Sequence, residues 1–147
     1  MTEQMIVDPA PTAMVSSTVR SLLCDLGHAA RPHEACGALL GRCAYGSYWE
    51  IDSVLPVDNA ATDATREFLI PAERVRALER HAASANLQLA GFFHSHPAGP
   101  ATPSASDHQR AWPGYLYAIV DASAGMVRFF TLEPERCQLV EVSALSR

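Results

Sequence analysis

Residues 94–107 read HSHPAGPATPSASD and follow an apolar run over residues 87–93. The apolar run is typical of a buried strand, along which residues i and i+2 point to the same face, about 6.5 Å apart. His94 and His96 can therefore bind one ion, and Asp107 supplies an oxygen ligand from beyond a turn rich in Pro and Gly. Two imidazoles and one carboxylate leave a fourth tetrahedral position open to water, as in catalytic zinc sites. The spacing thus predicts a divalent-metal centre, with zinc as the expected ion.

The same stretch carries a family resemblance. A Glu upstream, then His-Ser-His, seven residues, a Ser, two residues and an Asp resembles the JAMM motif of the MPN-domain metallopeptidases. Residues 97–103 separate His96 from Ser104, and two more residues separate Ser104 from Asp107, so the match has no gaps. The upstream acid corresponds to Glu34 in the sequence HEACGALLG, which is similar to the first strand-and-helix junction of small prokaryotic members.

The resemblance extends from about Val15 to Val142, nearly the whole chain. It implies one MPN-like domain, whose fold is similar to that of the cytidine deaminases. We therefore expect an α+β domain in which helices flank a curved, mixed β-sheet. We assign residues 1–13 to a flexible N-terminal leader and residues 14–147 to the domain.

Roles for the motif residues follow from the resemblance. It implies that His94, His96 and Asp107 hold one zinc ion per chain, although another divalent metal could occupy such a set. It implies that Glu34 reaches the metal-bound water without ligating the ion and passes the proton to the leaving nitrogen. It further implies that Ser104 donates a hydrogen bond to the oxyanion that develops on the scissile carbonyl.

Each of these residues also has a structural interpretation. Ser104 and Asp107 match a capping box at the start of a short helix, a pattern that predicts nothing about the two histidines upstream. The capping and metal roles can coexist. Glu34 lies at a helix-to-strand junction, where a Glu is most often a solvated charge. Ser95, between the histidines, is expected to face away from the metal and to serve strand packing or to fix the backbone. His108 is either a surface residue or a residue that contacts Asp107 and supports it as a ligand.

The composition is that of a small acidic domain. Of 147 residues, 48% are hydrophobic and 18% charged, which argues against extended disorder. The net charge of −5 makes a nucleic-acid partner unexpected, and no apolar run is long enough to span a membrane. We see no secretory signal and expect a cytoplasmic location. The four cysteines, at positions 24, 36, 43 and 137, have no C-x-x-C spacing. Cys24, Cys36, Cys43 and Cys137 are expected to be buried, reduced thiols, with a redox or second-metal role as the alternative.

Hydrophobic periodicity divides the chain into helices and strands. Apolar residues at helical spacing predict a helix from Val15 to Leu26, which Gly27 would end as a C-cap. A second helix is expected from Pro71 to about Asn86 and a short one from Pro103 to Trp112. Besides the strand that leads to His94 and His96, strands are expected at residues 35–41, 47–57, 66–70, 115–121, 126–132 and 137–142.

The resemblance to short bacterial members implies a substrate class. Such an enzyme would cleave an amide or isopeptide bond after the C-terminal Gly-Gly of a ubiquitin-like or sulfur-carrier protein. We expect a groove for the extended tail, with Asn59, Arg66 and Phe68 as candidate lining residues. Two alternatives stay open: an inert MPN scaffold that binds protein partners, and a RadC-like protein associated with nucleic acid, since RadC-like proteins share a similar metal segment. A homodimer is also left open.

Overall fold

The computed structural model describes residues 10–44, 47–133 and 136–144. These residues form eight strands and three helices. The strands are β1 (Thr12–Val15), β2 (Cys36–Ala44), β3 (Tyr48–Val57), β4 (Gln88–His96), β5 (Leu116–Asp121), β6 (Met126–Glu133), β7 (Arg136–Leu139) and β8 (Glu141–Ser143). The helices are α1 (Ser17–Ala30), α2 (Ala72–Ser84) and α3 (Ala105–Arg110).

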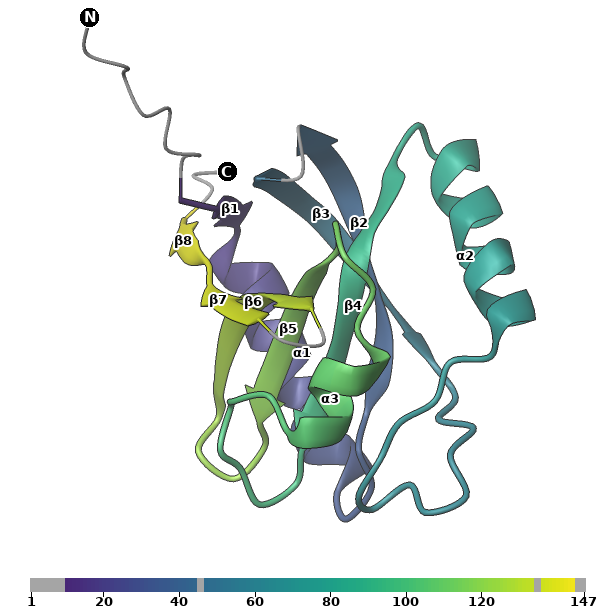
Figure 1. The fold of residues 1–147 in the computed structure, drawn as a ribbon, viewed down its shortest axis with the longest axis vertical. Coiled ribbons are helices and arrows are strands. Elements are labelled where there is room, and N and C mark those ends of the chain that lie inside the picture. Colours follow the sequence, from purple (N-terminus) through teal and green to yellow (C-terminus); the bar gives the residue numbers. More distant parts are fainter. Residues whose placement is uncertain (1–9, 45–46, 134–135, 145–147) are drawn as a thin grey trace, which may run out of the picture.

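The described strands form one mixed sheet in the order β7-β6-β5-β4-β2-β3-β1-β8. Strand β4, which carries the two histidines, is central: it pairs antiparallel with β2 and parallel with β5. The sheet is strongly curved (Figure 1), and only Val140 separates the strands at its two ends, β7 and β8. This architecture confirms the expected α+β domain with a curved, mixed sheet.

Alternate residues of β4 face opposite layers of the molecule. Phe93 packs in the main core with Leu23 of α1 and Val120 of β5. Phe92, one residue earlier, belongs to a separate apolar cluster that contains Val75 of α2. Figure 1 shows α1 behind the sheet and α3 in front of it. His94 and His96 therefore point, with Phe92, to the face away from α1.

The predicted end of the first helix is wrong. Helix α1 does not stop at Gly27 but continues to Ala30. Gly27 is buried on the side of α1 that faces the sheet, where a Cβ would lie 3.0 Å from Val120 and 3.1 Å from Ser95. The glycine thus lets α1 approach β4 and β5 closely, and does not serve as a cap.

Two further predictions about the elements need correction. The segment 66–70 is not a strand, because its backbone bonds to the loop that precedes it: Leu69 N–H donates to the Asn59 side chain, and Leu69 C=O accepts from Ala60. Thr12 and Ala13, which we assigned to the flexible leader, form part of β1, a strand that pairs in parallel with β3 and β8. Of the remaining leader, residues 1–9 lie outside the described residues.

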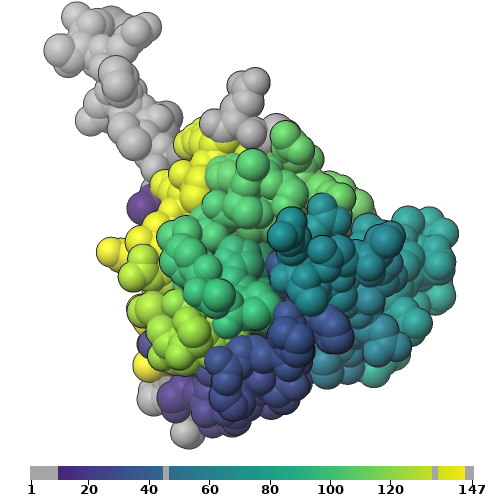
Figure 2. Space-filling view, turned by 90° about the horizontal axis from the view of Figure 1, so that it is seen from below, coloured from purple at the N-terminus to yellow at the C-terminus, as the bar shows by residue number. Residues whose placement is uncertain are grey.

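Three segments far apart in the sequence meet on one face of the molecule, below the end of β4 in Figure 1. Figure 2 shows this face, with segments around residues 30–36, 60–70 and 100–110 side by side. Two hydrogen bonds connect them: Glu34 N–H donates to Ala64 O at 2.7 Å, and Arg110 donates to Phe68 O at 3.4 Å.

None of the described helices is both long enough and apolar enough to cross a membrane.

Candidate metal centre

The two histidines occupy the carboxyl end of β4. His94 is fully buried and His96 is partly exposed. Ser95, between them, points to the opposite face, as its place in a strand requires. Its hydroxyl accepts from Ala35 N at 2.8 Å, and its own N–H donates to Ala35 O at 3.0 Å. The prediction that Ser95 fixes the backbone is therefore confirmed, and the segment it fixes is the one that follows Glu34.

Three potential ligand atoms converge on one point. Nε2 of His94 lies 3.2 Å from Nε2 of His96 and 3.1 Å from Oδ2 of Asp107, and the last two atoms are 3.3 Å apart. Ligand atoms around a tetrahedral zinc ion, at bond lengths of 2.0–2.1 Å, are about 3.3–3.4 Å from one another. One carboxylate oxygen and two ring nitrogens at these distances fit a divalent cation placed between them.

The ring orientation of His96 is set by a backbone carbonyl. Nδ1 of His96 lies 2.7 Å from Pro100 O, and since a carbonyl only accepts, Nδ1 carries the proton. When the ring is neutral, its lone pair is therefore on Nε2, the atom that faces His94 and Asp107. Burial opposes the charged form, but hydrogen bonds to Asp107 and Pro100 raise the pKa of His96. Sequence reasoning missed Pro100, because every residue has a backbone carbonyl and the residue type does not show which one will accept a hydrogen bond.

His94 is held by packing. Its ring stacks on Phe68, with centroids 4.4 Å apart and planes inclined by 18°. Its Nδ1 is buried and has no hydrogen-bond partner among the described residues. Burial lowers the pKa of His94, against the opposing effect of Asp107. His94 is thus kept neutral, which is the form in which imidazole binds metals.

Ser104 and Asp107 form the capping box of α3. Asp107 N–H donates to Ser104 Oγ at 3.2 Å, and Ser104 N–H donates to Asp107 Oδ2 at 2.8 Å. The same Oδ2 faces both histidines, so the capping geometry and the convergence of ligand atoms coexist. Burial opposes ionisation of Asp107, yet its hydrogen bonds with His94 and His96 hold its pKa well below the ordinary value. Asp107 is therefore a carboxylate at neutral pH.

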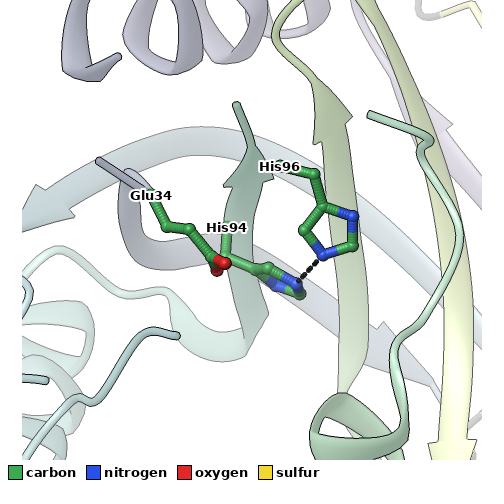
Figure 3. Close-up of side chains that lie close together, drawn as sticks. All are labelled: Glu34, His94 and His96. Atoms are coloured by element: carbon green, nitrogen blue, oxygen red, sulfur yellow. Dashed lines mark hydrogen bonds between the residues drawn. The ribbon is translucent and has the colours of Figure 1, made fainter. Parts of the chain in front are cut away.

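Glu34 enters the site from the connection between α1 and β2. It is buried, with 6% of its surface exposed, and is not a solvated charge. Figure 3 shows its carboxylate directed toward the two histidines, and one ligand atom from each of Glu34, His94 and His96 lies within 4.8 Å of the others. Burial raises the pKa of Glu34 to about 7. A carboxyl group with this pKa can both accept and donate a proton at neutral pH.

The candidate groove residues lie in different environments. Phe68 lines a groove of about 390 Å³ beside the site, together with Phe92 and Trp112. Arg66 is largely exposed and makes a long ion pair with Asp63, 3.9 Å, so it is a surface residue. Asn59 borders a second groove, beside Glu34, but its amide donates to the backbone carbonyls of Glu34 and Glu67. His108 bonds to Glu133 O at 3.2 Å, which favours its structural interpretation.

Comparisons with known proteins agree with this geometry. The model of the prokaryotic homologues of the JAB domain matches residues 16–133. The desampylase of Haloferax volcanii is 38% identical over 97 residues, which cover 65% of this chain and 67% of the relative. A solution structure of a protein from Desulfitobacterium hafniense has a TM-score of 0.80 at 25% identity and covers 92% of this chain and 94% of its own. One from Salinibacter ruber has a TM-score of 0.63 at 26% identity, with 92% of both chains covered.

The family match spans most of the chain and contains all five motif residues, from Glu34 to Asp107. The fold agrees with the solved structures along almost their whole length. The chain belongs to the prokaryotic homologues of the JAB domain, a branch of the JAMM/MPN family.

Proposed function

We propose that the protein is a zinc-dependent hydrolase that cleaves an amide or isopeptide bond after the C-terminal Gly-Gly of a ubiquitin-like or sulfur-carrier protein. The observation that carries this proposal is the convergence of His94, His96 and Asp107 within 3.1–3.3 Å of one another, with buried Glu34 beside them. The desampylase relative supports a ubiquitin-like substrate, because its name denotes removal of such a protein.

His94, His96 and Asp107 would hold the ion. A bound zinc ion supplies polarisation of the scissile carbonyl and activation of water. Glu34 accepts a proton from the attacking water and donates it to the leaving nitrogen, for which a pKa of about 7 is suited. The Ser104 hydroxyl accepts from Asp107 N–H, lies 3.2 Å from the Ser106 hydroxyl and is exposed, so it can turn its proton to the carbonyl oxygen of a substrate.

The groove beside the site is consistent with an extended peptide tail. It is mainly apolar, and its wall residue Phe68 also packs on His94. Glycine at the scissile end of the tail lets the backbone approach this buried centre closely. A cytoplasmic location is part of the proposal, and the protein is not required to dimerise, since the residues assigned to the reaction come from one chain.

The test uses a carrier protein with a Gly-Gly-cysteine or a Gly-Gly-lysine linkage. The purified protein is loaded with zinc and incubated with each substrate, with and without a chelator, and the products are identified by mass spectrometry. We expect release at the Gly-Gly end that the chelator abolishes. A zinc-loaded protein that leaves both linkages intact would contradict the proposed substrate class.

The alternatives have weaker support. An inert scaffold does not require a complete set of ligand atoms or a buried Glu34 next to it. A RadC-like role with nucleic acid is disfavoured by the net charge of −5. Stoichiometric zinc in the purified protein would separate an enzyme from a scaffold that has lost its metal.

A further inference from the structure

Asn59 uses its whole side-chain amide within the protein. It lies in the connection between β3 and α2, and its Nδ2 donates to two carbonyls, Glu34 O at 3.1 Å and Glu67 O at 2.8 Å. Its Oδ1 accepts from Ala61 N at 3.0 Å and Leu69 N at 3.1 Å. Two donors and two acceptor positions are the full capacity of an amide group. Asn59 is therefore occupied internally and is not free to bind substrate.

These bonds close residues 59–69 into one loop, which we call the bracket loop. Ala60 N–H also donates to Leu69 O at 3.0 Å, which joins the two ends of the loop. The loop holds the backbone of Glu34 from both sides, because Asn59 donates to Glu34 O and Ala64 O accepts from Glu34 N–H at 2.7 Å.

The bracket loop also contacts β4, the strand that carries His94 and His96. Phe68, near its end, stacks on the ring of His94. Glu34 lies in the connection between α1 and β2 and His94 lies on β4, so the loop is a common support for a proton-transfer residue and a ligand. Figure 1 shows this connection between β3 and α2 extending past the end of β4.

We infer that Asn59 is a positioning residue that places Glu34 for proton transfer, an inference that rests on the proposed function. A general base must lie within hydrogen-bond reach of its proton, and a displacement of about 1 Å can cost about a hundredfold in rate. Asn59 acts through the backbone of Glu34 and touches neither the substrate nor the metal ligands. Its loss should reduce turnover and leave zinc binding unchanged.

Three variants separate positioning from general loop stability. Asn59→Asp keeps the oxygen that closes the loop but places a second oxygen against the carbonyls of Glu34 and Glu67. Asn59→Ala removes all four bonds. Thr65→Val is the matched control, because Thr65 is exposed and its hydroxyl bonds to Asp63 within the same loop and not to Glu34.

The first measurement is amide hydrogen exchange of the metal-free proteins by NMR, which does not depend on catalysis. We expect the Glu34 amide to exchange at least about tenfold faster in both Asn59 variants and at the wild-type rate in Thr65→Val. The Leu69 amide should stay protected in Asn59→Asp and lose protection in Asn59→Ala. If the Glu34 amide exchanges at the wild-type rate in Asn59→Ala, the inference that Asn59 and the bracket loop hold the Glu34 backbone would be wrong.

The second measurement compares zinc content, kcat and KM of the loaded proteins. We expect both Asn59 variants to bind one zinc ion and to lose at least about tenfold in kcat, with KM within about twofold of wild type. Unchanged kcat, or a rise in KM alone, would overturn the positioning role. A wild-type protein without turnover would instead refute the proposed function and the catalytic part of this inference, while the exchange data would still decide whether Asn59 holds Glu34.

Discussion

Glu34 combines burial with a single proposed task. Its carboxylate lies next to two imidazoles, and removal from water raises its pKa to about 7. The charged form is thus costly to bury, and the nearby His96 offsets only part of that cost. A residue kept in this state is expected to serve function more than stability.

The variant Glu34→Gln tests this role. Glutamine has the same shape but cannot transfer the proton, so we expect kcat to fall by about 10²–10⁴-fold with the zinc content unchanged. The melting temperature should stay equal or rise, because a buried charge is removed. Turnover, zinc by mass spectrometry and thermal unfolding are measured on the same sample. Retained turnover would reject Glu34 as the proton carrier.

Ser104 is expected to affect both stability and rate. Ser104→Ala removes the cap of α3, which costs about 1 kcal/mol. It also removes the proposed donor to the oxyanion, for which we expect a loss of about 10²–10³-fold in kcat. The control is Ser106→Ala, whose hydroxyl lies 3.2 Å from that of Ser104 but is not part of the capping box. An equal loss of kcat in both variants would exclude a specific role for Ser104.

At the scale of elements, the central strand depends on close approach to its neighbour. A Cβ on Gly91 of β4 would overlap the backbone of Leu116 in β5. We expect Gly91→Ala to destabilise the protein by about 3 kcal/mol or more, measured by urea unfolding. Gly114→Ala is the comparison, because Gly114 has φ +89° but open space around it, so its cost is about 1–2 kcal/mol. Equal losses would show that β4 and β5 can separate without penalty.

Periodicity predicted most elements, but it failed where a distant contact decides the structure. The alternation of β4 placed His94 and His96 on one face, and the structure agrees. Gly27 has the residue type of a helix end, yet it lies inside α1 because the sheet requires a small residue there. Strand β1 pairs with β3 and β8, which are distant in the sequence, and the local sequence pattern did not predict this pairing.

For the candidate site, sequence reasoning predicted the motif residues but not the groups that hold them in place. The motif spacing predicted that His94, His96 and Asp107 lie together, the family resemblance added Glu34, and the structure brings these four side chains close to one another. The supporting groups, Pro100 O and the amide of Asn59, depend on the paths of two loops. Asn59 was predicted, with Arg66 and Phe68, to lie in a region that lines a substrate groove, while its bonding partners could be known only from the fold.

At the scale of the whole molecule, the candidate metal centre brings together segments from three parts of the chain. Binding of zinc to the folded protein alone stabilises it by about 4.1 kcal/mol at a free concentration of 1,000 Kd, which corresponds to a rise of about 10 °C in melting temperature. We expect a chelator to remove this gain. His94→Ala is the control and should melt at the same temperature with and without chelator. A wild-type protein insensitive to the chelator would contradict the ligand set.

The two tryptophans of the chain lie in opposite environments, and this gives the molecule a built-in optical reporter. Trp49 is fully buried in the main core, whereas Trp112 is 47% exposed at the rim of the groove, edge-on to Phe92. Iodide should quench the fluorescence of Trp112 and leave that of Trp49 unaffected. In Trp49→Phe the remaining fluorescence would come from Trp112 alone. Binding of a peptide tail in the groove could then be followed as a change in the wavelength and intensity of that emission.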